Sequence, residues 1–492
     1  TGHLATGDTG GWWGVELKRA GYDAIIVRGR SPHPVYLWID NGHAELRNAQ
    51  HLWGKDTWQT TDALRQELGE VGQHQIRILA IGPAGENLVR FAALINEYFH
   101  AQGRCGIGAV LGSKKLKAIA VRGSGRVSVA RPTEFAAAVR EAVHRITTPW
   151  HPGLEAPHRA FGSLGVLDAS RRQYEQGSLG GKNYQGGVPP QWLEKVTLEA
   201  ALPYLRGKEG VCYRCPIACF NVAEVNQGKY SGVRIASATF LAPIVEFGGK
   251  CGLVDLPAIW KCKEVCHRLG LDLASAAATV AFAMELYQRG IITRDEAGIP
   301  LVWGNDDSAL EMLHQIAYRR GLGDLLAEGS WQAARSLGGD AQRYAMNVKR
   351  LELFAPDPRA TGVLWSFGYL TNPRGGDNVK TSHTRLDRLP SPEFIRQRLG
   401  MTVEEYVAGY LASLDISPEE KVQFFGDSRT AIQGDDGTYT ALTMFVADKA
   451  ADLSAGTLYA AKWNQVSAAG TDGGKATLDW IKLGQAKHDD IK

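Results

Sequence analysis

The chain has 492 residues, a formal net charge of +3, 44% hydrophobic residues and 22% charged residues, proportions that are ordinary for a soluble globular protein. A charge this small gives no reason to expect nucleic-acid binding, and no run of about 18 apolar residues predicts a membrane span. The length predicts two to four domains, and seven cysteines suit a reducing cytoplasm better than a disulfide framework. Because the chain starts at Thr1 rather than Met, we expect it to begin inside a longer protein.

A glycine-rich segment at 7–14 opens the chain and precedes a short amphipathic segment at 15–20. Such an entry to a helix exposes backbone N–H groups that can bind an anion. The segment lacks the G-K-[ST] ending of a Walker loop, and a plain loop explains it equally well.

Short apolar or alternating runs at 24–27, 35–39, 76–81 and 116–121 predict strands, with one helix at 58–68 between them. Arg104 and the glycines at 106 and 108 lie between the last two of these strands. A guanidinium beside paired glycines suits a phosphate, although an ordinary glycine turn would look the same.

The most specific motif has the spacing C-x₂-C-x₃-C and consists of Cys212, Cys215 and Cys219. Three thiolates at this spacing can hold one face of an iron–sulfur cube or most of a tetrahedral zinc site. Zinc sites usually have a second Cys or His pair nearby and none follows here, so a cluster is favoured over a zinc knuckle or a redox pair. Pro216 predicts that a helix begins inside the motif, because Pro is tolerated in the first turn of a helix.

Helical periodicity dominates the later chain, at 253–269, 273–289, 307–320 and 323–337, and Gly270 is placed to end the first of these helices. Cys262 and Cys266 lie one helical turn apart and are better explained as core residues than as ligands.

Several ordered motifs together resemble the aldehyde ferredoxin oxidoreductase family of tungsten or molybdenum enzymes. They are Gly-Gly-Trp-Trp-Gly at 10–14, His-Leu-Trp-Gly-Lys-Asp-Thr at 51–57, Ile-Gly-Pro-Ala-Gly-Glu-Asn at 81–87, Gly-Ser-Lys-Lys-Leu-Lys-Ala at 112–118, the three cysteines, Gly-Asp-Leu-Leu-Ala-Glu-Gly at 323–329 and Arg-Gly-Gly at 374–376.

The resemblance implies an α+β fold. A β-rich pterin-binding domain at 1–127, lacking a first segment, would precede a helical domain at 128–347 that holds the cysteines and a helical C-terminal domain at 348–492. It also implies the cofactors: a bis-pyranopterin holding tungsten or molybdenum, a 4Fe–4S cluster, and Mg²⁺ bridging the pterin phosphates. The implied partners are a ferredoxin or similar small electron carrier and a small-molecule carbonyl substrate, and a homodimer is allowed.

Carried over position by position, the phosphate and bridging-cation site comprises Asp8, Gly10, Gly11, Arg104 and Cys105. Carbonyl groups near the first and last of these would help to hold Mg²⁺, which prefers oxygen ligands.

A second implied site contains Gly270, Leu271 and Asp272, which match a motif that binds a pterin amine, and Arg374 of the Arg-Gly-Gly motif. The leading acid of the pterin motif is replaced by His267, which when neutral can accept a hydrogen bond at only one nitrogen.

The sequence departs from the family at the positions that carry acid–base chemistry. Ala242 stands where the resemblance implies a catalytic Glu, with Glu246 one helical turn later as the candidate replacement, and Asn378 stands where it implies a His, beside Asp377. Glu246, Asp377 and Asn378 are therefore the candidate catalytic residues. Ala461 occupies the position of the fourth cluster cysteine, which predicts a cluster that is labile at one corner.

The resemblance favours oxidation of an aldehyde to a carboxylic acid. The alternatives are a low-potential reductase on the same scaffold, similar to benzoyl-CoA reductase, or an electron-transfer subunit without turnover.

Overall fold

The computed structural model describes residues 5–69, 76–147, 179–238, 241–354, 357–359, 368–370, 372–377, 396, 400–402 and 405. The chain divides into two compact units, and the first of them comprises 1–147, 156–360 and 372–377. Only short pieces of the second unit are described. Both the sheet and the helices discussed below belong to the first unit, so the α+β class predicted from the sequence is confirmed.

A six-stranded sheet with the order β2-β1-β6-β3-β4-β5 organises the N-terminal part of this unit. Strands β1 and β6 are parallel and the other neighbours are antiparallel. The strands are β1 (Val35–Asp40), β2 (His43–Asn48), β3 (Arg77–Ala80), β4 (Leu94–Asn96), β5 (His100–Gln102) and β6 (Leu116–Arg122). The predicted strands at 35–39, 76–81 and 116–121 are confirmed, whereas 24–27 forms no strand.

The sheet separates two apolar layers because successive side chains of a strand point to opposite faces. Ile119 and Val121 of β6 join Leu17 in one layer, and Ala118 and Ala120 join Leu64 in the other. The first layer is covered by α1 (Trp13–Arg19) and α4 (Ile107–Ser113), and the second by α2 (Thr57–Glu67), the helix predicted at 58–68. Four shorter or peripheral helices complete this part: η1 (Gln50–Leu52), α3 (Pro83–Glu86), η2 (Arg104–Gly106) and α5 (Pro132–Thr147).

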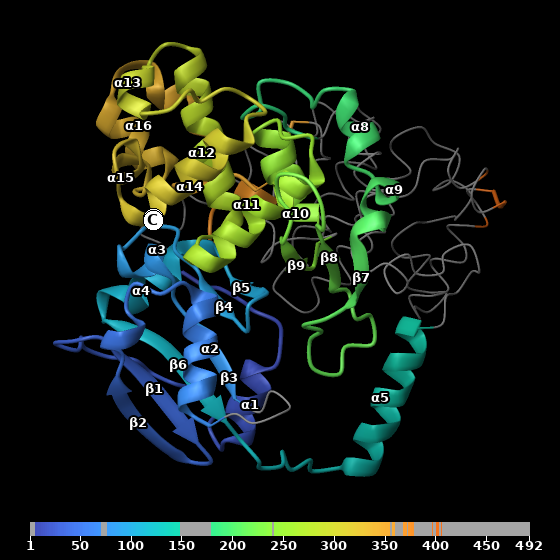
Figure 1. The fold of residues 1–492 in the computed structure, drawn as a ribbon. Helices are drawn as coiled ribbons and strands as arrows, with labels where there is room; N and C mark the ends of the chain where they lie inside the picture. The colour runs from blue at the N-terminus through green and yellow to red at the C-terminus, as the bar shows by residue number, and fades with distance from the viewer. Residues whose placement is uncertain are drawn as a thin grey trace, which may run out of the picture. The chain divides into compact units, whose positions relative to one another are not determined.

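The rest of the unit is mainly helical (Figure 1). Its long helices are α11 (Leu256–Leu269), α12 (Leu273–Gln288), α14 (Asp306–Tyr318) and α16 (Ser330–Leu337). Its shorter helices are α8 (Gln191–Lys195), α9 (Leu198–Ala201), η5 (Leu202–Tyr204), α10 (Leu241–Pro243), η6 (Ile244–Lys250), α13 (Arg294–Ala297), α15 (Leu322–Leu326) and η7 (Gly339–Tyr344). Its strands are β7 (Leu205–Lys208), β8 (Asn221–Glu224), β9 (Arg234–Ala236), β10 (Asn347–Val348) and β11 (Leu351–Glu352).

The predicted helices agree with α11, α12 and α14, but the segment at 323–337 forms two helices rather than one. The break falls at Gly329, whose φ of 84° and ψ of 157° are not helical. Cys262 and Cys266 of α11 are buried in the core, as predicted. No helix in the described part of the chain combines the length and apolar character that a membrane span requires.

The helical part is joined to the sheet part at the turn between α11 and α12. Gly270 ends α11 with a left-handed φ of 71°, and its carbonyl accepts a hydrogen bond from Ala93 N at 2.8 Å. Asp272 N then donates to Phe91 O at 2.9 Å. A Cβ at position 270 would lie 2.7 Å from Gly82 N, so only glycine permits this approach.

Candidate functional site

The cysteine motif lies in the loop between β7 and β8, the lower green loop of Figure 1, and its three side chains are partly exposed. The helix predicted to begin at Pro216 is absent, and the motif consists of turns instead. Arg214 and Ala218 have left-handed φ angles of 50° and each directly precedes a cysteine. Left-handed residues at these positions break the helix, and alternating conformations of this kind form the N–H-lined concavities found at iron–sulfur sites.

The thiols of the motif lie close enough to influence one another electrostatically. Burial raises the pKa of Cys219, and Cys212 and Cys215 raise it further, which requires the three groups to be close. Within the described residues no three Cys, His, Asp or Glu side chains form a site for a single metal ion. The cluster is favoured over zinc by the sequence, because no second Cys or His pair follows the motif closely.

The glycine-rich loop near the N-terminus rests directly against the cysteine loop, about 200 residues away in the sequence. Gly11 N donates to Cys212 Sγ at 3.4 Å, and Trp12 Nε1 donates to Val211 O at 2.8 Å. Tyr213 N donates back to Gly11 O at 3.2 Å. A Cβ at Gly10 would lie 2.7 Å from Cys212 Sγ, so the absence of a side chain is what allows the two loops to meet.

His100 in β5 links the same two loops and was not singled out in the sequence. Its Nε2 lies 2.6 Å from Gly210 O, and its ring stacks on Phe220 with centroids 4.3 Å apart. A Cβ at Gly10 would be 3.1 Å from Nδ1 of this histidine. Burial lowers the pKa of His100, so the neutral ring donates from Nε2 to the carbonyl.

Arg104 is buried behind the glycine loop and faces two carboxylates from distant parts of the chain. Its Nε lies 3.6 Å from Asp272 Oδ2 and 3.4 Å from Asp377 Oδ2, and its Nη2 donates to Glu352 O at 2.5 Å. Burial alone would lower the pKa of Arg104, but Asp272 and Asp377 outweigh it and raise the pKa. The arginine is therefore a permanent cation at the centre of the group.

Arg374 adds a second buried guanidinium to this group. Its Nη2 lies 3.0 Å from Asp377 Oδ2 and its Nη1 lies 3.8 Å from Asp8 Oδ2 on the glycine loop. The structure thus brings together Asp8, Arg104, Asp272, Arg374 and Asp377, all of which the sequence had suggested as site residues.

The remaining candidates contribute mainly through their backbone. Cys105 has a left-handed φ of 75° directly after Arg104. Leu271 is a core residue whose backbone pairs with Ala92, and it places Asp272 opposite Arg104. Asp272 is also the N-cap of α12, where Oδ2 accepts from Ser275 N at 3.1 Å.

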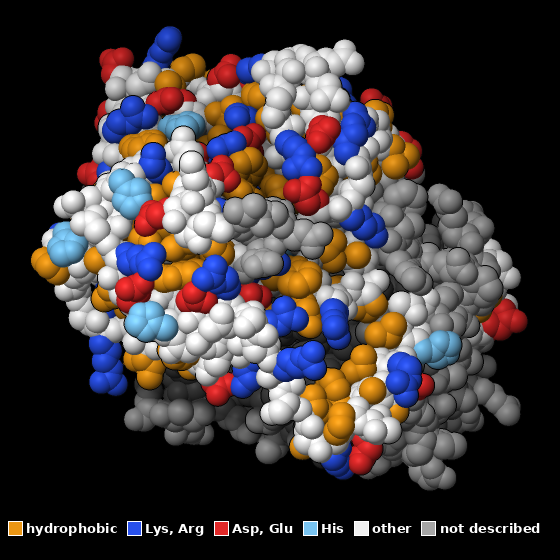
Figure 2. Space-filling model, turned by 60° about the horizontal axis from the view of Figure 1, so that its bottom comes forward, with side chains coloured by type: hydrophobic (Ala, Val, Ile, Leu, Met, Phe, Trp, Pro, Cys, Tyr) orange, Lys and Arg blue, Asp and Glu red, His pale blue; other side chains and the backbone are white. Residues whose placement is uncertain are grey.

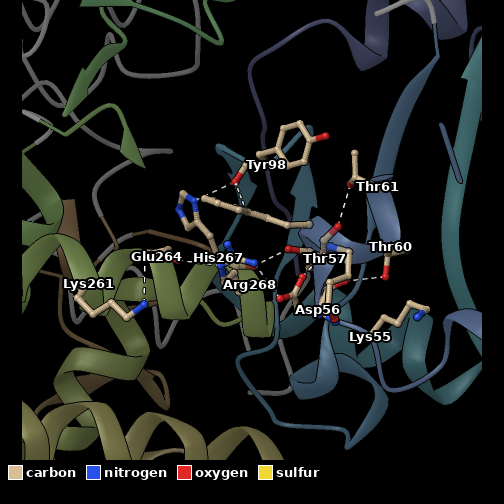
Figure 3. A network of polar contacts seen from close by, with 12 residues as sticks. Lys55, Asp56, Thr57, Thr60, Thr61, Tyr98, Lys261, Glu264, His267 and Arg268 are labelled. Carbon is tan, nitrogen blue, oxygen red and sulfur yellow. Dashed lines mark hydrogen bonds and ion pairs between the residues drawn. The ribbon is translucent and has the colours of Figure 1, made fainter. Parts of the chain in front are cut away.

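His267 lies in a polar network that joins α11 to α2 (Figure 3). Its Nδ1 lies 3.2 Å from Tyr98 O, and its own carbonyl accepts from Thr57 Oγ1 at 2.8 Å. Arg268 extends the network to Asp56 at 3.0 Å and to Glu264 at 2.8 Å. Burial lowers the pKa of His267 to about 3, so this side chain is neutral and is used to fix the turn before Asp272.

Two of the three candidate catalytic residues are described. Glu246 is fully buried in η6, and its Oε2 lies 2.6 Å from Nζ of Lys250. Asp377 is held between Arg104 and Arg374, as given above. Asn378 and Ala461 lie outside the described residues.

The donors left over in this group fit an anionic cofactor. Nη1 of Arg104 and Nε of Arg374 are buried and donate no hydrogen bond within the described part of the chain, whereas Nε of Arg104 faces the carboxylates of Asp272 and Asp377. Buried guanidinium donors are normally satisfied, and phosphate oxygens are well suited to accept from them. Beside a glycine loop that admits close backbone approach, these donors fit the phosphates of a pterin cofactor.

Comparison with known protein families gives two matches that together cover most of the chain. Residues 1–123 match "Aldehyde ferredoxin oxidoreductase, N-terminal domain", and residues 138–431 match "Aldehyde ferredoxin oxidoreductase, domains 2 & 3".

Curated relatives agree with these matches. The tungsten-containing aldehyde ferredoxin oxidoreductases of Pyrococcus furiosus and Thermococcus kodakarensis are 42% and 40% identical over 77% of this chain. A protein named aliphatic sulfonate oxidoreductase, WOR-like subunit, from Pyrococcus furiosus is 30% identical over 75% of this chain. The chain spans 60% of the length of each of these relatives.

Among solved structures, the active-site complex BamBC of benzoyl coenzyme A reductase with 1,5-dienoyl-CoA is similar, with a TM-score of 0.67 and 26% identity. The similarity covers 86% of this chain and 62% of that chain.

Proposed function

The chain belongs to the aldehyde ferredoxin oxidoreductase family, and on that premise we propose that it is a tungsten-pterin oxidoreductase with a 4Fe–4S cluster. The observation that carries the proposal is the contact between Gly11 N and Cys212 Sγ at 3.4 Å. It joins a loop suited to pterin phosphates to a loop suited to a cluster, which is the arrangement that electron transfer between two cofactors needs.

The residues that would hold the cofactors follow from their chemistry. Arg104 and Arg374 offer unused donors to pterin phosphates, and Asp272 offers a carboxylate to a pterin amine. Carbonyl oxygens near Asp8 and Cys105 suit Mg²⁺, which prefers oxygen ligands. The cluster would be held by Cys212, Cys215 and Cys219. The position at which the family resemblance implies a fourth cysteine is Ala461, which lies outside the described residues.

The proposed reaction converts an aldehyde and water into a carboxylic acid, two electrons and two protons. When bound, the tungsten centre supplies the two-electron chemistry, and a ferredoxin or similar carrier takes the electrons singly. The chain's own residues bind and orient the cofactor, exclude water and accept a proton. A placed base contributes about 10²–10⁴-fold to such a step. Glu246 is the better candidate, because Asp377 is engaged by two arginines.

An electron carrier would approach the partly exposed cysteine loop. Arg214 is exposed beside Cys215, and its guanidinium lies 5.3 Å from the centre of the Tyr213 ring. The face in Figure 2 carries scattered Lys and Arg side chains among hydrophobic ones rather than one continuous basic field.

A second candidate function is a low-potential reductase on the same scaffold. The replacement of the implied catalytic Glu and His by Ala242 and Asn378 favours it. The benzoyl-CoA reductase complex supports it less strongly than the aldehyde enzymes support the leading proposal, because it is 26% identical to the chain and they are 40% and 42% identical. A non-catalytic electron-transfer subunit is the third candidate.

These candidates can be separated with full-length protein purified under strict anaerobiosis. Elemental analysis would establish whether tungsten or molybdenum is present with iron, and a dye-linked screen would test aldehydes, carboxylic acids and acyl-CoA esters. Aldehyde-dependent dye reduction supports the leading proposal, and turnover of acyl-CoA esters alone supports the reductase. No turnover by metal-loaded protein supports the electron-transfer subunit and refutes the leading proposal.

A further inference from the structure

Lys250 is a fully buried cation that no motif in the sequence singled out. Its Nζ lies 2.6 Å from Glu246 Oε2 and donates to Leu353 O at 2.5 Å. Burying an ion pair is costly, and replacement by apolar residues is often neutral or stabilising. The pair is therefore poorly explained by stability alone.

Two unusual backbone segments meet at this lysine. The helix that carries both members of the pair, η6 (Ile244–Lys250), is a π-helix, a rare form that occurs often at functional sites. Opposite it, Lys182, Asn183 and Tyr184 have consecutive left-handed φ angles of 47°, 53° and 67°. Left-handed conformations are unfavourable for residues other than glycine, so the surrounding structure must enforce the turn.

The left-handed turn fixes the end of η6. Lys182 N donates to Gly249 O at 3.2 Å, and Asn183 N donates to Lys250 O at 3.2 Å. The ring of Tyr184 lies 5.2 Å from Lys250 Nζ, within the range of a cation–π contact. Both the backbone and the side chain of the lysine are thus held by strained residues.

The pair lies next to the arginine that we assign to the cofactor. Lys250 donates to the carbonyl of Leu353, and Arg104 Nη2 donates to the preceding carbonyl, that of Glu352, at 2.5 Å. Glu246 also contributes to the electrostatic environment of Arg104. The buried pair and the cofactor-binding group therefore share one short stretch of chain, β11 (Leu351–Glu352) and its next residue.

We propose that Glu246 and Lys250 form one proton-transfer unit of the reaction, in which Lys250 is a positioning residue that fixes the Glu246 carboxylate. This inference rests on the proposed function. Of the two protons released when an aldehyde and water give a carboxylic acid, the Glu246 carboxylate accepts one. The two electrons leave through the cofactor and the cluster to the one-electron carrier.

The groups that face Lys250 come from several elements. Burial lowers the pKa of Lys250, Glu246 of its own helix and the neighbouring Cys251 raise it, and Arg104 of η2 (Arg104–Gly106) lowers it. Tyr184 covers the ammonium group from the left-handed turn.

The test uses the metal-loaded full-length protein and the variants Lys250→Met, Glu246→Gln and the double variant. Each single change should reduce kcat by about 10²–10⁴-fold while tungsten and iron contents stay at the wild-type level. The double variant should recover the Tm that the single variants lose, because no unpaired charge is left, but not the activity. Lys250→Arg, which keeps the positive charge, should restore part of kcat with a displaced pH profile.

Lys263→Met is the matched control. Lys263 is also buried, but among the described residues it donates to the carbonyls of Ala236 and Ser237, at 2.9 and 2.6 Å, and forms no ion pair. Its removal should leave kcat and the pH profile unchanged. Recovery of both Tm and kcat by the double variant, or an unchanged pH profile in Lys250→Met, would overturn the proposal. Absence of turnover in metal-loaded wild-type protein would instead refute the proposed function itself.

Discussion

Replacing Gly10 with alanine should prevent assembly of the cluster while leaving the fold intact. The added Cβ would lie 2.7 Å from Cys212 Sγ and 3.1 Å from His100 Nδ1, both inside normal contact distance. A free thiol could relieve this contact by rotating about χ1, at little cost. A thiol that is bound to iron cannot rotate, so the contact would have to be relieved by moving the glycine loop or by losing the ligand.

The expected magnitudes differ between the empty and the loaded protein. Overpacking of a well-filled site costs about 1–3 kcal/mol, and the rotation available to a free thiol places the empty variant at the lower end of that range. In the cluster-loaded protein the contact between the added Cβ and Cys212 Sγ directly opposes the bond between that sulfur and iron. We therefore expect iron content to fall well below the wild-type level, with a Tm of the metal-free protein close to wild type.

Gly14→Ala is the matched control for this variant. Gly14 lies in α1 only a few residues away, and a Cβ there would meet nothing within 4 Å. Alanine in place of a helical glycine should stabilise the protein by about 0.5–1 kcal/mol and leave iron content unchanged. Iron and acid-labile sulfide analysis, with electron paramagnetic resonance of the reduced protein, measures the outcome. A Gly10→Ala variant that keeps wild-type iron and an unaltered cluster signal would refute the reasoning.

Three further predictions concern the surrounding group. Arg104→Met leaves the buried carboxylate of Asp272 without its cation and leaves Asp377 with Arg374 alone, so it should lower the free energy of unfolding by about 3–5 kcal/mol. Met at the exposed Arg90 should lower it by less than about 1 kcal/mol, and urea unfolding measures both. Gly270→Ala should lower the free energy of unfolding more than Gly290→Ala does. Both glycines have left-handed φ angles near 70°, but only a Cβ at position 270 would collide with facing backbone, and equal decreases in the free energy of unfolding would contradict this. Burial lowers the pKa of His267 from 6.5 to about 3, so the stability present above pH 6.5 is lost as the pH falls toward 3, by an amount on the order of a few kcal/mol. Urea titrations at pH 7 and 4.5 should therefore show that the free energy of unfolding falls less between these pH values in His267→Gln than in the wild type. Equal decreases would contradict the conclusion that His267 is buried in its neutral form.

The hydrophobic pattern of the sequence predicted most of the regular structure in the sheet and in the long helices. The strand predicted at 24–27 was wrong, because an apolar run becomes a strand only when a neighbouring strand pairs with it. Its Ile26 is 78% exposed, while Ile25 and Val27 pack against the sheet without joining it. The segment at 323–337 kept its helical periodicity across Gly329, where the backbone breaks.

The site was predictable where a motif is continuous and was missed where it depends on tertiary contacts. Arg104 and Asp272 belong to recognisable motifs, and in the structure Nε of Arg104 lies 3.6 Å from Oδ2 of Asp272. The sequence around His100 and Lys250 gives no sign of their role. His100 bonds to a carbonyl on a distant loop, and Lys250 bonds to a distant carbonyl from the end of a π-helix that a left-handed turn holds in place. The helix expected at Pro216 does not form because the left-handed residues directly before Cys215 and Cys219 override the preference of proline.

We infer that the glycine loop and the cysteine loop bind two coupled redox cofactors. Metal analysis of anaerobically purified full-length protein, combined with electron paramagnetic resonance during a reductive titration, can establish whether both are present. We expect tungsten or molybdenum together with cluster iron in the wild type, and a magnetic interaction between the two centres. Zinc bound to Cys212, Cys215 and Cys219 in a protein that holds no tungsten, molybdenum or cluster iron would contradict it.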